Sequence, residues 1–183
     1  RGFEMDILGY DPFVTEDAAA RRGIRLASVA EILREADAIT VHVPLTAKTR
    51  GMIGAAELAT MKKEAFLINV ARGGVIDEAA LADALAAGTI AGAAVDVYSE
   101  EPLPADNPLR GAPNTILTPH LGASTEEAQT RVAIETAEQV LDVLAGRSAR
   151  YAVNAPLLTP ETAQALAPYL PLARMLGRLY AQF

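Results

Sequence analysis

The fold is decided by one stretch of the chain, Ala65-Phe66-Leu67-Ile68-Asn69-Val70-Ala71-Arg72-Gly73-Gly74. Its first seven residues are nearly all apolar, as expected of a strand buried on both faces of a parallel sheet. An arginine and two glycines follow at once, and glycine lets a ligand come close to the backbone. Ligands of open α/β sheets bind at the carboxyl ends of the strands. The stretch therefore predicts a parallel sheet with a binding site at Arg72.

Outward from this stretch, short apolar runs alternate with helical patterns, and Ser28 is expected to cap one of the helices. Strands that alternate with helices predict βαβ units, hence an α/β fold with a doubly wound parallel sheet. The expected strands are residues 5–10, 24–26, 38–43, 65–70, 92–97 and 115–117, and the expected helices are 15–22, 29–36, 55–61 and 78–87.

The pattern changes after residue 120. Residues 124–144 predict one long amphipathic helix, with Ser124 and Glu127 as a capping box and Gly146 at its end. Proline-containing turns follow, and a second helical segment carries apolar residues at helical spacing up to Phe183. We place a domain boundary near Pro156. Because the chain begins at Arg1 close to an expected strand and stops within this helical pattern, we expect it to be part of a longer polypeptide.

Composition narrows the class of protein. The chain has 183 residues, enough for one or two domains, and 51% of them are hydrophobic, which predicts a soluble globular protein. The net charge of −7 argues against a nucleic-acid partner, and no apolar run is long enough for a membrane span. Cysteine is absent, which excludes disulfides and thiol catalysis, and two separated histidines make a poor metal site.

Three residues far apart in sequence each follow a predicted strand: Arg72, Glu101 and His120. Arginine can grip a carboxylate with two hydrogen bonds, histidine can move a proton near neutral pH, and glutamate can orient that histidine. Taken singly, each residue could instead be an ordinary solvated loop residue. Together they predict an acidic small-molecule substrate and a proton transfer.

Three further polar residues have two readings each. Asp11, after a strand and before Pro12, could accept hydrogen bonds from an adenosine ribose or could simply start a turn. Asp96 lies in an apolar strand, where it could face a ligand or serve as a structural hydrogen-bond acceptor. His42, between two valines, is expected to be a core histidine bonded to backbone rather than a functional one.

Five motifs, in order, resemble those of the NAD-dependent D-2-hydroxyacid dehydrogenases. They are Tyr10-Asp11-Pro12, His42-Val43-Pro44-Leu45-Thr46, Asn69-Val70-Ala71-Arg72-Gly73-Gly74, Asp96-Val97-Tyr98-Ser99-Glu100-Glu101-Pro102 and Thr118-Pro119-His120-Leu121-Gly122. Two later runs, from Gly122 to Gln129 and from Val153 to Pro156, are most similar to the phosphoglycerate dehydrogenase branch of that family.

The resemblance implies a role for each matched position. Arg72 would bind the substrate carboxylate and carbonyl, His120 would be the general acid and base, and Glu101 would be its partner. Asp11 would hold the adenosine ribose of NAD, and Asp96 would hold the nicotinamide carboxamide. The other residues expected at the cofactor are Val43, Pro44, Ala71 and Gly122, with Thr49 near the phosphates or the nicotinamide.

The resemblance also implies how the chain is divided. Residues 1–123 would be the C-terminal part of a Rossmann-like NAD-binding domain. Residues 124–155 would form the return helix and the segment that joins the substrate-binding domain, and residues 156–183 would begin a regulatory or assembly domain. The glycine-rich pyrophosphate turn and most of the substrate-binding domain are missing from the sequence.

The function implied is the NAD-linked oxidation of a D-2-hydroxyacid, with 3-phosphoglycerate of serine biosynthesis as the leading substrate, giving 3-phosphohydroxypyruvate. A cytoplasmic homo-oligomer is expected. Two alternatives stay open: a related dehydrogenase acting on glyoxylate, hydroxypyruvate or D-lactate, and an NAD-sensing binding protein of the same fold. The terminal helical segment could also serve assembly, because its apolar face would need a partner.

Overall fold

A computed structural model describes residues 4–147, 149, 151–152 and 160–182. The chain divides into two compact units, Arg1–Thr125 and Glu126–Phe183, which are treated separately below.

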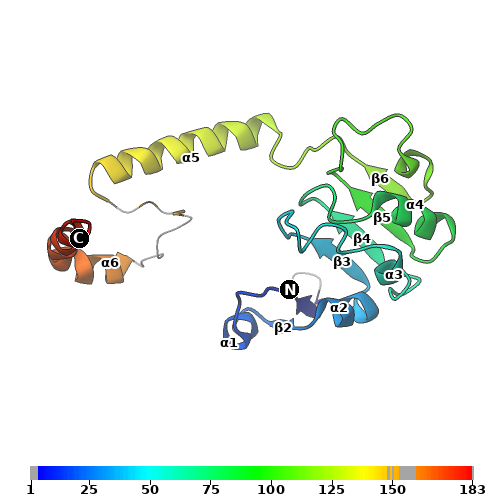
Figure 1. Cartoon of the computed structure of the whole chain (residues 1–183), viewed down its shortest axis with the longest axis horizontal. Helices are drawn as coiled ribbons and strands as arrows, with labels where there is room; N and C mark the ends of the chain where they lie inside the picture. Colours follow the sequence, from blue (N-terminus) through cyan, green and yellow to red (C-terminus); the bar gives the residue numbers. More distant parts are fainter. Residues whose placement is uncertain (1–3, 148, 150, 153–159, 183) are drawn as a thin grey trace. The chain divides into compact units, whose positions relative to one another are not determined.

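All the strands of the first unit pair in parallel, which confirms the expected parallel α/β class (Figure 1). They form a two-stranded sheet, β1–β2, and a four-stranded sheet in the order β3–β4–β5–β6. The strands are β1 (Ile7–Gly9), β2 (Ile24–Leu26), β3 (Ala38–Val41), β4 (Phe66–Asn69), β5 (Gly92–Val95) and β6 (Thr115–Leu117).

Of the four α-helices described in this unit, three begin at a capping side chain. Ser28 caps α2, as expected from the sequence, and the structure adds a capping box with Glu31. Thr15 and Asp77 cap α1 and α4. A 3-10 helix, η1, lies in the proline-rich loop before β6, where no helix is expected from the sequence. The elements are α1 (Glu16–Ala20), α2 (Val29–Glu35), α3 (Ala55–Leu58), α4 (Glu78–Ala86) and η1 (Pro108–Gly111).

The hydrophobic core lies on one face of the four-stranded sheet. Ile39 and Val41 of β3 and Leu67 of β4 pack into one cluster with side chains of α2, α3, α4 and η1. On the strands, alternate residues point the other way, and Phe66 and Ile116 keep 52% and 67% of their surface exposed. The expectation that the strands are buried on both faces is therefore wrong within this unit, because its own helices cover only one face.

Three strands of the four-stranded sheet end earlier than expected. β3 stops at Val41, β4 at Asn69 and β5 at Val95, whereas the apolar patterns run one or two residues further. The extra residues belong to loops that are fixed by side-chain hydrogen bonds, as at Ala71, whose backbone N–H donates to the Asn69 carbonyl oxygen Oδ1 over 3.1 Å. Hydrophobicity alone does not distinguish a strand end from such a loop.

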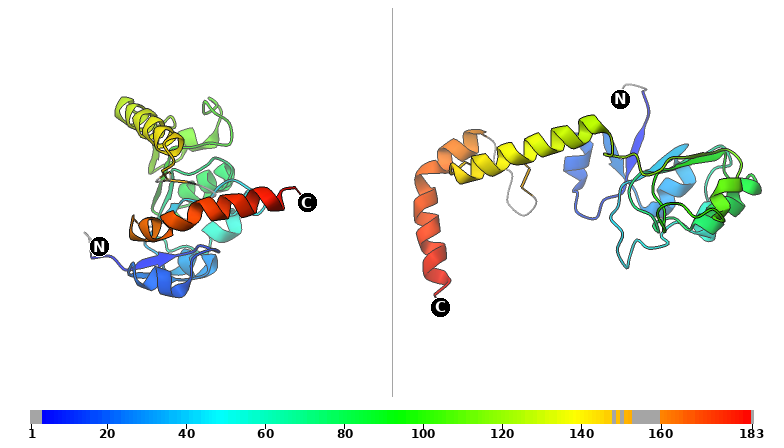
Figure 2. Two further views of the ribbon diagram at one scale, coloured as in Figure 1. Left: turned by 90° about the vertical axis from the view of Figure 1, so that its left-hand side faces the viewer. Right: turned by 90° about the horizontal axis from the view of Figure 1, so that it is seen from above.

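The second unit is helical. The expected long helix is present as α5 (Glu126–Leu144), and it is followed by α6 (Pro160–Leu166), η2 (Ala167–Tyr169) and α7 (Leu170–Tyr180) (Figure 2). The expected boundary near Pro156 lies outside the described residues. Across the part of the chain that the structure describes, no helix is both long and apolar enough to cross a membrane.

Candidate active site

The strand register brings the candidate residues to one edge of the sheet. Across the four strands, Val41 is paired with Asn69, Asn69 with Val95, and Val95 with Leu117. Because all four strands are parallel, the chain leaves them at the same edge (Figure 1). The loops that carry Arg72, Glu101 and His120 start there.

Glu101 and His120 meet directly. The His120 ring nitrogen Nδ1 lies 2.7 Å from the Glu101 oxygen Oε2, and the two side chains remain 42% and 36% exposed. The other carboxylate oxygen of Glu101 accepts a hydrogen bond from the Tyr98 backbone N–H over 3.0 Å. These two hydrogen bonds, the one with His120 first, lower the pKa of Glu101 below its ordinary value. An ionised Glu101 can orient the imidazole through Nδ1, so that Nε2 is the nitrogen that can exchange a proton with a ligand.

His120 has an unusual backbone conformation. Its φ is 54°, in the left-handed region that a residue with a Cβ seldom adopts, and Ala123 has a φ of 61°. Strained backbone of this kind is held by its surroundings and clusters at functional sites.

Asp96 provides much of that support. The residue is 5% exposed, and its carboxylate accepts hydrogen bonds from the Thr118 hydroxyl at 2.5 Å and from the backbone N–H groups of Leu121 at 2.7 Å and Gly122 at 2.8 Å. Burial acts to raise the pKa of Asp96, but the three hydrogen bonds outweigh it, and the pKa lies below its usual value. Asp96 is thus a structural acceptor for the His120 loop, one of the two readings drawn from the sequence.

The Arg72 turn is shaped by a buried amide. Asn69, 2% exposed, donates from Nδ2 to the Arg72 carbonyl over 3.1 Å and accepts from the Ala71 N–H. The Arg72 guanidinium donates to the Ala71 carbonyl over 2.6 Å. Among the described residues, no ion pair joins Arg72 to an acidic side chain.

The Arg72 turn nevertheless lies against the loop that carries Glu101. A Cβ built on Gly73 would fall 1.8 Å from the Tyr98 carbonyl oxygen and 2.6 Å from the Ser99 nitrogen. The two backbones are therefore in contact, which only glycine permits here. The structure thus brings Glu101 and His120 together and holds Arg72 in the adjoining turn.

Two residues with clear supporting roles were missed by the sequence reasoning, Asn69 and Tyr98. The buried Tyr98 hydroxyl lies 2.8 Å from the Val95 carbonyl and 2.9 Å from that of Thr118, two residues before His120. Burial raises the pKa of this phenol. The sequence signal that could have indicated them is a polar side chain at the end of an apolar run, close to Arg72 or Glu101.

The residues expected at the cofactor follow strands of both sheets, with Asp11 after β1 and Thr49 in the loop after β3. Asp11 is exposed and accepts the Phe13 N–H over 2.8 Å, which fits the turn reading, and it also borders a pocket of about 400 Å³ with Tyr10 and Val14. Thr49 donates to the Pro44 carbonyl over 2.6 Å and so closes the turn after β3.

His42 departs from its expectation. It is exposed, and its Nε2 lies 2.9 Å from the Thr40 hydroxyl, so it is not a core histidine. Thr40 lies on the uncovered face of β3, and His42, the first residue after the strand, contacts it on that side.

The groups at the sheet edge fit the nicotinamide end of a dinucleotide. Gly122 has no Cβ, and one built there would lie 3.1 Å from the Asp96 oxygen Oδ2. This oxygen accepts one of the three hydrogen bonds to the carboxylate, which leaves it capacity for a further donor such as a carboxamide. The sequence contains no G-x-G-x-x-G turn for the pyrophosphate. Within the residues described, no group of three or more acidic or histidine side chains could hold a metal ion.

Comparison with known proteins gives consistent matches. The family model described as "D-isomer specific 2-hydroxyacid dehydrogenase, NAD binding domain" matches residues 1–122. The D-3-phosphoglycerate dehydrogenase of Synechocystis is 51% identical over 178 residues, which are 97% of this chain and 32% of that protein. The enzyme of the same name from Methanocaldococcus jannaschii is 49% identical over all 183 residues, 35% of its length. This chain thus spans about a third of the length of these curated relatives.

Solved structures agree on the fold. The D-lactate dehydrogenase of Lactobacillus jensenii with NAD+ superposes with a TM-score of 0.72 at 31% identity, covering 84% of this chain and 50% of the other. The D-lactate dehydrogenase of Aquifex aeolicus, in complex with NAD and lactic acid, has a TM-score of 0.66 at 32% identity, covering 79% and 48%.

Proposed function

Because this chain belongs to the D-isomer specific 2-hydroxyacid dehydrogenase family, we propose that its full-length protein oxidises a D-2-hydroxyacid to the 2-oxoacid with NAD. The family is the one that the sequence motifs resemble. Its matched domain is an NAD-binding domain, so the expected cofactor is confirmed. The leading substrate is 3-phosphoglycerate, which would place the protein in serine biosynthesis.

One observation carries the proposal, the contact of 2.7 Å between His120 Nδ1 and the Glu101 carboxylate. It occurs at the carboxyl edge of a parallel sheet, on a strained backbone that Asp96 holds in place. An imidazole fixed in this way by a carboxylate is suited to take a proton from a hydroxyl and to carry the positive charge that results.

Each catalytic residue then has one task. When bound, NAD supplies the acceptor for the hydride that leaves C2 of the substrate. His120 takes the proton of the C2 hydroxyl through Nε2, and Glu101 stabilises the imidazolium that forms. Arg72 releases the Ala71 carbonyl and holds the substrate carboxylate with its two-pronged guanidinium, whose charge also polarises the adjacent carbonyl. The hydroxyl proton and the hydride together account for the two hydrogens that the substrate loses.

The cofactor contacts belong to the same proposal. Asp11 accepts hydrogen bonds from the adenosine ribose, and Asp96 uses its remaining acceptor capacity for the nicotinamide carboxamide. Asp11 borders a pocket, and Asp96 lies at the edge of the sheet, and these positions support the two contacts. The other proposed contacts, which include two catalytic residues, are Val43, Pro44, Thr49, Ala71, Arg72, His120 and Gly122.

The relatives support 3-phosphoglycerate over the alternatives. Those at 42–51% identity over nearly the whole chain are named D-3-phosphoglycerate dehydrogenase. The D-lactate dehydrogenases among the solved structures are 31–35% identical, so they support the fold more strongly than the substrate.

An NADH absorbance assay of the full-length protein tests this function. We expect NADH production with NAD and 3-phosphoglycerate, at a higher kcat/KM than with D-lactate, D-glycerate or glycolate. A preference for one of the simpler hydroxyacids would reject the substrate and keep the reaction class. Tight NAD binding without NADH production from any of them would favour the NAD-sensing protein instead.

The proposal also covers organisation. Residues 1–123 form part of the NAD-binding domain, residues 124–155 lead to the substrate-binding domain, and residues 156–183 begin a further domain. The unit division after Thr125 and the family match over residues 1–122 support the first boundary. A cytoplasmic homo-oligomer completes the proposal.

A further inference from the structure

The loop between β5 and η1 is closed by a side chain from outside it, that of Glu78 at the start of α4. One oxygen of this carboxylate, Oε1, accepts the Ser99 backbone N–H over 2.6 Å. The other, Oε2, accepts the Asn107 side-chain N–H over 2.7 Å. Glu78 is 21 and 29 residues away from these two partners in sequence, so a single carboxylate joins the two ends of the 99–107 segment.

The far side of the loop is fixed as well. Arg110 of η1 donates to the carbonyls of Leu103 and Pro104, at 2.6 and 2.7 Å. Besides its contact with Glu78, Asn107 caps η1 by accepting the Leu109 N–H over 3.0 Å. The bond from Glu78 to Ser99 anchors the other end of the loop, the end nearest Glu101.

Glu101 and Glu78 bind two consecutive backbone amides. The Glu101 oxygen Oε1 accepts the Tyr98 N–H, and the next amide along the chain is the Ser99 N–H that Glu78 holds. The orientation of the peptide groups on both sides of Tyr98 therefore affects the carboxylate that contacts His120. We propose that Glu78 is a positioning residue, which sets the Glu101 carboxylate for its contact with His120 by fixing the Tyr98–Ser99 backbone.

The proposal rests on the proposed dehydrogenase function for its kinetic consequence, though not for its structural one. A simpler role for Glu78 would be the favourable placement of a negative charge in the first turn of α4. That role needs the charge alone, whereas positioning needs acceptors for two particular donors. Variants that separate charge from hydrogen bonding can therefore decide between the two roles.

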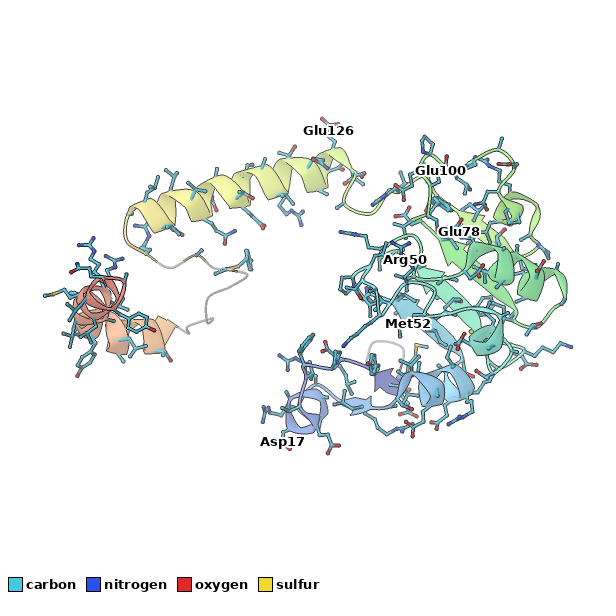
Figure 3. All side chains as sticks on the ribbon, viewed as in Figure 1. Asp17, Arg50, Met52, Glu78, Glu100 and Glu126 are labelled. Atoms are coloured by element: carbon cyan, nitrogen blue, oxygen red, sulfur yellow. The ribbon has the colours of Figure 1, made fainter. Side chains whose placement is uncertain are left out.

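The neighbouring Glu100 offers a matched control. It is exposed, it lies in the same loop, and both glutamates are labelled in Figure 3. Glu100→Gln removes the same charge as Glu78→Gln but disturbs none of the hydrogen bonds described above.

A paired exchange provides the rescue. In Glu78→Gln, the new amide group has one acceptor for two donors, so either Ser99 or Asn107 loses its partner. In Asn107→Asp, two carboxylates face each other. When both substitutions are combined, the amide introduced at position 78 can accept from Ser99 through its oxygen and donate through its nitrogen to the carboxylate introduced at position 107. The net charge then equals that of the wild type, and the new carboxylate can still accept the Leu109 N–H.

The experiment measures kcat, the KM for NAD and Ser99 amide hydrogen exchange in the full-length protein and these variants. We expect Glu78→Gln and Asn107→Asp each to lower kcat about tenfold, since a small misplacement of a catalytic group is costly. The KM for NAD should change by less than about twofold, and the double variant should recover most of the loss. Ser99 exchange should accelerate in the single variants and return in the double variant. Glu100→Gln should match the wild type in every measurement.

A kcat for Glu78→Gln equal to that of Glu100→Gln, or a double variant no better than the single ones, would overturn the proposal. A wild-type protein without dehydrogenase activity would reject the proposed function instead. Ser99 exchange then decides alone: unchanged exchange in Glu78→Gln rejects the positioning role, and faster exchange that the double variant restores supports it.

Discussion

The Glu101 carboxylate joins two segments of the site, with one oxygen on the His120 imidazole and the other on the Tyr98 amide. Both bonds can form with a neutral donor, because the Glu101 carboxylate carries the negative charge itself. Its lowered pKa keeps it ionised over the range in which an imidazole can exchange a proton. At this scale, the candidate site is a histidine whose direction is fixed by one carboxylate and whose backbone is fixed by another, that of Asp96.

Removing the imidazole tests its role directly. His120→Asn should lower kcat in the full-length protein by a factor of about 10² or more, because general acid–base catalysis is lost. Asparagine tolerates the left-handed backbone at this position, so folding should be preserved. His42→Asn, at the other histidine of the chain, is the control and should leave kcat near the wild-type value. Near-normal turnover of His120→Asn would remove His120 from the mechanism.

Asp96→Asn should destabilise the protein by about 1–3 kcal/mol at pH 7, because the new amide group cannot accept from all three donors. The folded pKa of Asp96 is lowered, so its stabilisation is complete above the unfolded pKa of about 4 and is lost as the pH falls through the folded pKa. The difference in unfolding free energy between wild type and variant should therefore shrink below about pH 4.

Urea unfolding across this pH range makes the measurement, with the exposed Asp106→Asn as control. A difference that stays constant down to about pH 2 would show that the Asp96 charge is not what stabilises the loop.

Polar and charged residues that follow apolar runs could be predicted as site residues from the sequence, and the Glu101–His120 pair is the clearest example. The supporting residues Asn69, Tyr98 and Glu78 could not. Except for the bond between Glu78 and the Asn107 side chain, their hydrogen bonds are to backbone groups, and a sequence pattern does not encode which backbone N–H or C=O will lack a partner. His42 shows a different limit of sequence analysis. Its place between two valines predicted a buried side chain, but in the structure His42 is exposed.

At the scale of elements, the site depends on two loops that fit together without a gap. Gly73 lies against the Tyr98–Ser99 backbone so closely that no side chain could be added, and Gly122 lies against Asp96. The sequence indicated that Gly73 and Gly74 allow close approach to the backbone, and it suggested a ligand as the approaching group. In the structure, the group that approaches Gly73 is the neighbouring loop.

Gly73→Ala should therefore separate the Arg72 turn from the Glu101 loop. A Cβ 1.8 Å from a carbonyl oxygen cannot be accommodated by side-chain motion, so we expect a loss of about 2 kcal/mol or more in unfolding free energy. Gly111→Ala is the control, because nothing lies within 4 Å of a Cβ built there, and it should change stability by less than about 0.5 kcal/mol. Equal unfolding midpoints for the two variants in urea would contradict this packing.

The order of strands and helices in the first unit was predictable because short apolar runs, capping residues and glycines alternate regularly. Ser28 marks a helix start with the expected capping chemistry, and Gly88, with a φ of 66°, follows the end of α4. The exact strand ends and η1 were not predictable. They depend on side-chain hydrogen bonds, such as that of Asn107 with the Leu109 N–H, that replace regular pairing.

At the scale of the whole molecule, large apolar side chains remain exposed on α7. Those of Leu172, Leu176, Leu179 and Tyr180 recur at helical spacing, with 53–84% of their surface exposed. We expect the chain to self-associate through such surfaces, with a mass by light scattering above the 19.2 kDa of one copy. Leu176→Arg should shift the distribution towards the monomer. A monodisperse monomer of the unaltered chain would contradict this expectation.

The central claim is that Arg72, Glu101 and His120 surround one substrate beside the nicotinamide. A crystal structure of the full-length protein with NADH and a 2-oxoacid tests it most directly. We predict the ligand carboxylate on the Arg72 guanidinium, which has left the Ala71 carbonyl, and the carbonyl oxygen within about 3.2 Å of His120 Nε2. The ligand bound away from His120, or Arg72 still bonded to Ala71 with the carboxylate held elsewhere, would contradict the account.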